Sequence, residues 1–389
     1  MSVTGPRGFV AAGASCGIKA SGAPDLALVC THDRVAVPAA AVFTSNKAKA
    51  APVLVSSAHL ESTQGRAAAV ICSSGNANAQ TGGAGRLAAE RMCELVAGGI
   101  GTSPEEVLVC QTGLIGVPFP IGKFEDGFAQ LVGALDGGPA AARQAAVAMM
   151  TTDTVDKEVL VEASGFSVGG MAKGAAMLAP DMATMLAVLT TDARCGPDGL
   201  ARILKGAVAM SFNEMTVDGC CSTNDTVVLL SSGLAGPVAE AELLHATVQA
   251  CAVLAEAMVS DAEGASKVAR VTVVAAASDA EAARAARKVA QSLLVKCSLN
   301  GADPYWGRIV SELGSAGVEF DPDLVAVSYG GVKVCSEGIA VGHDSAAVSS
   351  HLAGQTIEIE CHLDLGTGRA SVLTCDLGHG YIDENRSTS

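Results

Sequence analysis

Short apolar runs alternate along the chain with longer stretches in which apolar residues recur at helical spacing. Residues 68–73 form a run of small and β-branched side chains, which predicts a strand. Residues 85–96 repeat apolar positions three and four apart, which predicts a helix, and a longer helix is expected from residue 239 to near residue 264. This alternation indicates a layered α/β or α+β fold.

A capping sequence marks the start of a second region. Residues 271–274 have the β-branched composition of a strand, and Ser278 follows, with Glu281 three residues later. Serine and glutamate at this spacing form a capping box, so we expect a helix over residues 282–294. At this strand-to-helix switch we divide a larger domain, residues 1–275, from a smaller C-terminal α/β domain, residues 276–389.

One threonine directly precedes an apolar run. Thr184 is followed by Met-Leu-Ala-Val-Leu and preceded by a segment rich in glycine, alanine and proline that contains Lys173. If the bond between Ala183 and Thr184 were cut, Thr184 would carry a nucleophilic hydroxyl and a free α-amine able to act as its base. An α-amine titrates at about pH 8, so a useful fraction is neutral at physiological pH. The alternative is an ordinary threonine at the start of a buried strand.

Five further segments occur in the order of a known family. They are residues 73–79 (Ser-Ser-Gly-Asn-Ala-Asn-Ala), 111–116 (Gln-Thr-Gly-Leu-Ile-Gly), 150–154 (Met-Thr-Thr-Asp-Thr), 261–267 (Asp-Ala-Glu-Gly-Ala-Ser-Lys) and 301–308 (Gly-Ala-Asp-Pro-Tyr-Trp-Gly-Arg). Together with Thr184 they resemble the ornithine acetyltransferase (glutamate N-acetyltransferase) family, from about Gly8 to the last residues. The resemblance implies a layered α-β-β-α core, with the threonine at the start of a central strand, and a smaller C-terminal α/β domain.

The resemblance also implies an autoprocessed enzyme. Cleavage between Ala183 and Thr184 would leave an α chain of residues 1–183 and a β chain that starts at Thr184. Thr184 would then take an acetyl group from N2-acetyl-L-ornithine and pass it to L-glutamate, a ping-pong scheme that releases L-ornithine and N-acetyl-L-glutamate. Members of this family commonly assemble as two α and two β chains, and they differ in whether acetyl-CoA is a second donor.

Thr112 and Gly113 match the oxyanion hole of the family. There a hydroxyl and a backbone N–H stabilise the negative oxygen of the tetrahedral intermediate. Read without the resemblance, the two residues would be an ordinary Thr-Gly turn.

Thr151, Lys173 and Glu263, together with Thr184, match substrate-contacting positions of the family. Their chemistry suits an amino-acid substrate, because a lysine offers a point positive charge for a carboxylate and a glutamate can pair with a distal amine. Considered in isolation, Lys173 would be a solvated loop charge and Glu263 a surface or helix-end carboxylate.

The C-terminal segment, residues 376–389, resembles the closing segment of the family, in which an asparagine and a terminal Ser or Thr reach back into the site. We carry these roles over to Asn385 and Ser389. The spacing is one residue shorter than usual, so Thr388 is the alternative to Ser389. Asp181 also departs from the family, which often has asparagine at that position.

Composition and charge exclude several classes of partner. The chain has 389 residues, a formal net charge of −15 and a pI of about 4.8, which argues against a nucleic-acid or anionic-membrane partner. No run reaches the roughly 18 apolar residues of a membrane helix, and the N-terminus lacks a signal-peptide pattern. We therefore expect a cytoplasmic enzyme that acts on small amino-acid substrates.

Neither cysteine nor histidine spacing predicts a metal, a disulfide framework or a cofactor. The thirteen cysteines lack a Cys-x-x-Cys pair, so most are expected to be small buried hydrophobic residues, and Cys220-Cys221 is more often a packing feature than a redox site. The seven histidines are dispersed, without the spacing of metal ligands.

Three other functions were weighed. Residues 13–17, Gly-Ala-Ser-Cys-Gly, fit the Gly-x-Ser-x-Gly pattern of α/β-hydrolases, in which Ser15 would be the nucleophile, but the surrounding sequence favours a chance match. A stronger alternative is an aminopeptidase or amidase of the same autoprocessed architecture, with water as the acyl acceptor. A binding module that retains the fold would require an uncleaved chain and no acetyl-enzyme.

Overall fold

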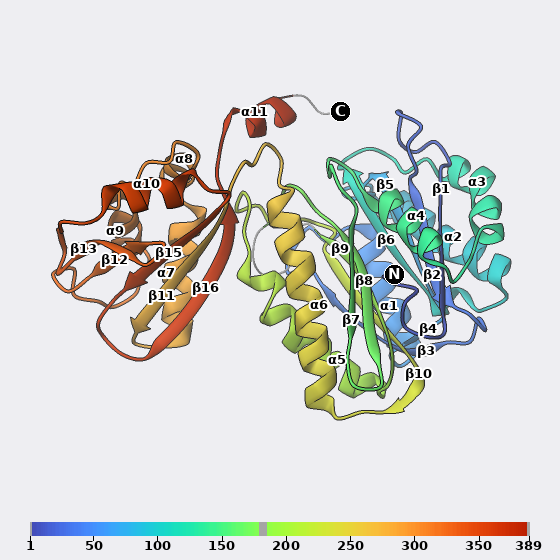
Figure 1. The fold of residues 1–389 in the computed structure, drawn as a ribbon. Coiled ribbons are helices and arrows are strands. Elements are labelled where there is room, and N and C mark those ends of the chain that lie inside the picture. Colours follow the sequence, from blue (N-terminus) through green and yellow to red (C-terminus); the bar gives the residue numbers. More distant parts are fainter. Residues whose placement is uncertain (1, 179–184, 387–389) are drawn as a thin grey trace. The chain divides into compact units, whose positions relative to one another are not determined.

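The computed structural model describes residues 2–178 and 185–386, which form two compact units. The first comprises Met1–Asn213 and Cys220–Met258, and the second comprises Glu214–Gly219 and Val259–Ser389 (Figure 1). The boundary predicted at residue 275 therefore moves to residue 258, and a short segment before it joins the second unit. The physical reason is strand pairing, because the strand expected to close the first domain is central to the sheet of the second.

The first unit contains two sheets. A four-stranded sheet has the order β1 (Phe9–Ala14), β2 (Leu26–Thr31), β5 (Ala69–Asn76) and β6 (Val107–Leu114), and a six-stranded sheet has the order β4 (Arg66–Ala67), β3 (Val37–Phe43), β10 (Thr226–Pro237), β9 (Leu186–Arg194), β8 (Ser167–Lys173) and β7 (Lys157–Glu162). The pairs β5/β6 and β9/β10 are parallel, and the other strand pairs are antiparallel. The predicted strand at residues 68–73 corresponds to β5.

Successive side chains of each strand point to opposite faces of its sheet, and the first unit is therefore layered. The inner faces of both sheets share one core, in which Val70 and Leu108 of the first sheet meet Val188 and Val228 of the second. Alanines of α4 (Pro139–Met149) join this core. The outer face of the four-stranded sheet packs against α1 (Ala51–Ser62), α2 (Gly82–Ile100) and α3 (Ile121–Gly133).

Helices α5 (Pro197–Ala209) and α6 (Glu240–Ser260) lie along the six-stranded sheet (Figure 1). Leu254 of α6 approaches the sheet, with Cδ1 3.4 Å from the position that a Cβ on Gly170 would occupy. The predicted α-β-β-α core is therefore confirmed, and so are the helices expected at residues 85–96 and from residue 239.

The sequence has no unbroken apolar run of membrane-helix length, but α6 is apolar enough by length and overall composition to cross a membrane, with a mean hydropathy of 1.4 over its most apolar window. Half of that window is buried, and the buried residues Leu243, Ala246, Ala250 and Leu254 recur at helical spacing along one face. This stripe packs inside the unit, as the core helix of a globular protein does.

The second unit is built on one six-stranded sheet. Its order is β14 (Ile339–Ala340), β13 (Val332–Ser336), β12 (Ala326–Tyr329), β15 (Thr356–His362), β11 (Val268–Ala276) and β16 (Gly368–Cys375). Its helices are α7 (Asp279–Gln291), α8 (Leu293–Asn300), α9 (Gly307–Gly314), α10 (Ser345–Ala353) and α11 (His379–Asn385). Side chains from α7 to α10 and from alternate positions of the strands form its core.

The predicted capping sequence is confirmed in part. The Ser278 side chain accepts a hydrogen bond from the Glu281 N–H and caps α7. The helix expected to run to residue 294 stops earlier, because Ser292 leaves the helical conformation and caps α8 through the Val295 N–H.

All thirteen cysteines are free thiols, and eight of them are buried, as expected for small hydrophobic residues. The adjacent pair differs from the expectation of packing, because Cys220 is exposed and Cys221 is only half-buried.

Candidate active site

Three predicted site residues meet in the first unit. Lys173 ends β8, where it pairs with Leu186 of β9, and only 3% of its surface is exposed. Its Nζ donates hydrogen bonds to Thr151 Oγ1 at 2.7 Å and to Thr112 Oγ1 at 3.4 Å. The alternative of a solvated loop charge is therefore wrong, because pairing with β9 draws the lysine into the interior.

A buried carboxylate organises this cluster. Asp153 accepts hydrogen bonds from the Gly174 N–H at 2.7 Å, the Thr151 N–H at 3.0 Å and Lys157 Nζ at 2.7 Å. Its Oδ2 lies 3.9 Å from Lys173 Nζ. Burial opposes ionisation, but the charges of Lys173 and Lys157 outweigh it and hold the pKa of Asp153 well below its usual range.

Sequence reasoning assigned Asp153 no role, although it lies in the 150–154 segment. The Asp153–Lys157 spacing is visible in the sequence. The proximity of Asp153 to Lys173 depends on the fold. Lys173 ends β8, and the N–H of the next residue, Gly174, donates a hydrogen bond to Asp153.

Thr112 and Gly113 lie near the end of β6, opposite Ser74 and Gly75 of β5. Gly113 has a φ of +129°, and a Cβ there would stand 2.3 Å from the Gly75 carbonyl carbon. Glycine is required both by this φ and by the close approach of the two strands. The pair is part of a strand rather than a Thr-Gly turn, which leaves the Thr112 hydroxyl beside the Lys173 ammonium.

Buried amides hold the strand ends around Thr112. Asn78 Nδ2 donates to Gln111 Oε1 at 2.8 Å, and Asn224 Nδ2 donates to the carbonyl oxygens of Gln111 at 2.9 Å and Ala77 at 2.6 Å. The first bond pairs two buried side-chain amides, and the other two join the Asn224 side chain to backbone carbonyls, as buried polar groups require. Asn78 lies in the 73–79 segment, whereas Asn224 carried no signal in the sequence.

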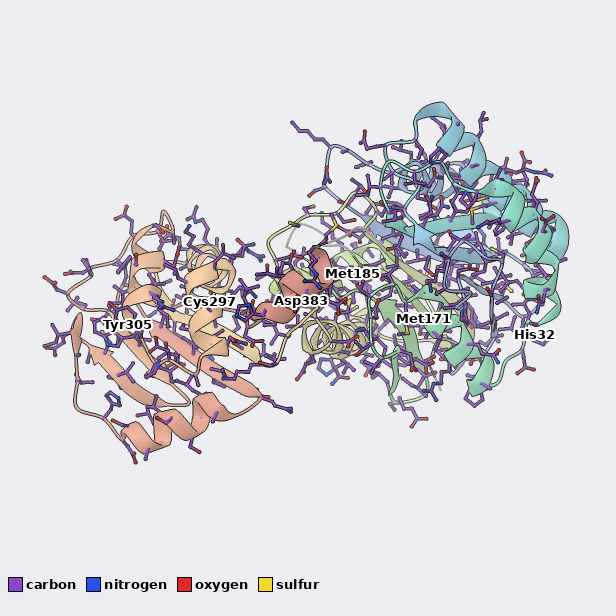
Figure 2. The ribbon with its side chains drawn as sticks, turned by 90° about the horizontal axis from the view of Figure 1, so that it is seen from above. His32, Met171, Met185, Cys297, Tyr305 and Asp383 are labelled. Atoms are coloured by element: carbon purple, nitrogen blue, oxygen red, sulfur yellow. The ribbon has the colours of Figure 1, made fainter. Side chains whose placement is uncertain are left out.

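Met185, labelled in Figure 2, follows the predicted nucleophile in the sequence and directly precedes β9. Its N–H donates to Asp225 Oδ1 at 3.0 Å, and its carbonyl accepts from the Thr226 N–H at 3.1 Å. Asp225 is fully buried, and burial raises the pKa of its carboxyl well above the usual range. The chain is thus anchored directly after position 184, while Thr184, Ala183 and Asp181 lie outside the described residues.

Two more predicted residues meet in the second unit. Asn385, exposed on α11, donates from Nδ2 to Glu263 Oε2 at 2.5 Å and to the Tyr381 carbonyl at 2.9 Å. The neighbouring Gly264 has a φ of +65°, and a Cβ there would stand 2.1 Å from the Tyr381 N. The half-buried Glu263 and the C-terminal helix are therefore held together, and Ser389 and Thr388 lie outside the described residues.

The hydrolase pattern around Ser15 lacks the structure that the motif requires. A nucleophile elbow is a strand-turn-helix, whereas β1 is followed by a loop that leads into β2. Ser15 is exposed, and its Oγ donates to the Gly22 carbonyl at 3.2 Å. Within residues 2–178 and 185–386, no group of three or more His, Cys, Asp or Glu side chains could hold a metal ion.

Comparisons with known proteins cover the whole chain. The model of the ArgJ family matches residues 10–388. The chain is 47% identical, over 394 residues, to the arginine biosynthesis bifunctional protein ArgJ of Mycolicibacterium paratuberculosis, covering 100% of this chain and 96% of that protein. It is 45% identical over 392 residues to the protein of the same name in Streptomyces coelicolor, with both chains covered completely. The crystal structure of ornithine acetyltransferase with ornithine from Mycobacterium tuberculosis is 48% identical over 46% of this chain and 94% of that chain, with a TM-score of 0.44.

Proposed function

Since the chain belongs to the ArgJ family, an acetyl-transferring family of arginine biosynthesis, we propose that it transfers the acetyl group of N2-acetyl-L-ornithine to L-glutamate. The products are L-ornithine and N-acetyl-L-glutamate. The observation that carries the proposal is the buried contact of Lys173 with Thr112 and Thr151, because it places a cation beside the predicted oxyanion residues.

In the proposed mechanism the chain is first cut between Ala183 and Thr184. The Thr184 hydroxyl then attacks the acetyl carbonyl of N2-acetylornithine, and the α-amine of the same residue accepts the hydroxyl proton. The carbonyl oxygen becomes negative and is stabilised by the Thr112 hydroxyl and the Gly113 N–H. When the bond from the acetyl carbon to the ornithine nitrogen breaks, the protonated α-amine returns the proton to that nitrogen, and ornithine leaves.

The second half-reaction reverses these steps with another amine. The neutral α-amine of glutamate attacks the acetyl-Thr184 ester, the ester bond to Oγ breaks, and the Thr184 hydroxyl regains a proton. Lys173 and Thr151 suit the α-carboxylate that both substrates carry, since a buried ammonium and a hydroxyl both donate to carboxylate oxygens. Glu263, oriented by Asn385, suits the side-chain ammonium of ornithine.

A label-transfer assay separates this reaction from the amidase alternative. Purified protein is incubated with N2-acetylornithine that carries a labelled acetyl group, with and without glutamate. The proposal predicts labelled N-acetylglutamate only when glutamate is present. Labelled acetate formed at the same rate with or without glutamate would instead assign an amidase that uses water. The same assay with labelled acetyl-CoA and glutamate determines whether acetyl-CoA is a second donor.

We further propose that the processed protein is a cytoplasmic heterotetramer of two α and two β chains. The assembly is what the resemblance to the ornithine acetyltransferase family implies, and the location follows from the sequence expectation of a cytoplasmic enzyme. Native mass spectrometry tests the assembly, because it distinguishes a four-chain complex from a single α/β pair.

A further inference from the structure

A second cation lies close to the predicted oxyanion residues. Lys19 is half-buried in the loop between β1 and β2, and its backbone N–H donates to Asp25 Oδ2 at 3.1 Å. Its Nζ donates to the carbonyl oxygen of Pro24 at 2.6 Å. Across residues 2–178 and 185–386, no carboxylate lies within ion-pair distance of this ammonium, so its direct partner is a neutral carbonyl.

Gly75 of β5 lies between Lys19 and the predicted oxyanion residue Gly113. A Cβ on Gly75 would stand 3.0 Å from Lys19 Cγ, and Gly75 pairs with Gly113 in the β5/β6 register. The lysine stem therefore packs against the strand whose other edge faces Gly113.

The charges of Lys173 and Asp153 also influence the pKa of Lys19. Burial lowers the pKa of Lys19, and the positive charge of Lys173 lowers it further, whereas Asp25 and Asp153 oppose the shift. Lys173 and Lys19 are thus close enough for their charges to interact. They differ in their partners, because Lys173 bonds to two site hydroxyls and faces a carboxylate.

The two substrates of the proposed reaction differ in their side-chain charge. N2-acetylornithine has one carboxylate and a side-chain ammonium, whereas glutamate has two carboxylates. A site that accepts both needs an acidic group for the ornithine ammonium and a basic group for the second carboxylate of glutamate. In the proposed function Glu263 is the acidic group for the ornithine ammonium. No residue has so far been assigned to the second carboxylate of glutamate.

We propose that Lys19 binds the side-chain carboxylate of glutamate and so determines the choice of acceptor. This inference rests on the proposed function. In the acceptor complex the Lys19 ammonium exchanges its bond to the neutral Pro24 carbonyl for one to a carboxylate, which adds the attraction of two opposite charges to the hydrogen bond.

The test compares glutamate with glutamine, which differ in the charge of one group. In Lys19→Met, kcat/KM for glutamate should fall about tenfold to a hundredfold, the size of one lost hydrogen bond to a charged group. The kcat/KM for glutamine should stay unchanged, so the glutamate/glutamine ratio falls by the same factor. Ornithine release from N2-acetylornithine in a single turnover should also keep its wild-type rate, and Lys19→Arg should retain the preference.

Lys123→Met is the matched control. Lys123 belongs to α3, and its ammonium donates to the Gly17 carbonyl of the same loop at 2.5 Å, so this variant removes a nearby cation that does not pack on Gly75. It should keep the wild-type ratio. An unchanged ratio in Lys19→Met, or an equal fall in the donor half-reaction, would overturn the inference. If Lys19→Met does not fold, Lys19→Gln is measured in the same way. A wild type that transfers no acetyl group would overturn the proposed function, and this inference with it.

Discussion

The two groups of predicted site residues are held in different ways. In the first unit Lys173 and Asp153 are buried at a strand end, and backbone N–H groups and a second lysine fix the carboxylate. In the second unit Glu263 is half-buried, and its partner Asn385 is exposed on the seven-residue helix α11. The first group is therefore part of the core, and substitutions there should lower both stability and activity. Substitutions in the second group should weaken substrate binding and leave stability unchanged.

The largest effect is expected for Asp153→Asn. This change leaves the buried ammonium groups of Lys157 and Lys173 facing a neutral amide. Removing one member of a buried ion pair costs about 3–5 kcal/mol, so the free energy of unfolding should fall by that amount, and acetyl transfer should be lost. Chemical denaturation measures the first effect and the label-transfer assay the second.

The matched control for this change is Asp156→Asn, which removes a half-buried carboxylate whose ion-pair partner is the exposed Arg143. Its cost should stay below about 1 kcal/mol. The pH dependence gives a second check. Because the folded-state pKa of Asp153 lies below the unfolded value of about 3.9, its contribution is fully present above that pH. The difference between wild type and Asp153→Asn should therefore shrink as the pH falls below about 4. Equal costs for the two variants would contradict the comparison.

Gly113→Ala should have the next largest effect. A Cβ at Gly113 would collide with the Gly75 backbone, so β5 and β6 must separate and displace the oxyanion N–H. Loss of one oxyanion donor lowers kcat by about a hundredfold to a thousandfold, and pre-steady-state ornithine release would report it. Gly116→Ala is the control, because Gly116 also has a positive φ, of +81°, but open space around it. We expect a stability cost of about 1–2 kcal/mol for the control and little change in kcat. A similar kcat in the two variants would remove Gly113 from the oxyanion hole.

The smallest effect on the fold is expected for Glu263→Gln. The new amide oxygen can still accept the hydrogen bond from Asn385, so the free energy of unfolding should change by less than about 0.5 kcal/mol. The kcat/KM for N2-acetylornithine should fall about tenfold, because its side-chain ammonium loses a charged partner. Glu256→Gln, an exposed change on α6, should alter neither quantity. A large loss of stability in Glu263→Gln would show that the second group is also structural.

Local signals in the sequence predicted the elements, and the family resemblance predicted the layers. The strand at residues 68–73 and the Ser278 cap follow from side-chain type and spacing, and both are present. The extent of the second unit could not be read this way, because β11 belongs to it through pairing with β15 and β16, which lie far along the chain.

The same limit applies to the candidate site. The identities of Thr112, Thr151 and Lys173 came from the resemblance, but their mutual contacts depend on three separate parts of the fold. Lys173 was open to interpretation as a solvated charge, because its burial depends on β9, a strand on the other side of the predicted cleavage site. Asp225 carried no local pattern, since its role follows from hydrogen bonding to Met185.

Denaturing mass spectrometry tests the central claim most directly. Freshly purified protein is measured before and after brief exposure to N2-acetylornithine without glutamate. The account predicts two fragments that join between Ala183 and Thr184, with one additional acetyl group on the fragment that begins at Thr184. A single full-length mass in a preparation that transfers acetyl groups would contradict the account, because neither the free α-amine nor the Thr184 intermediate would then exist.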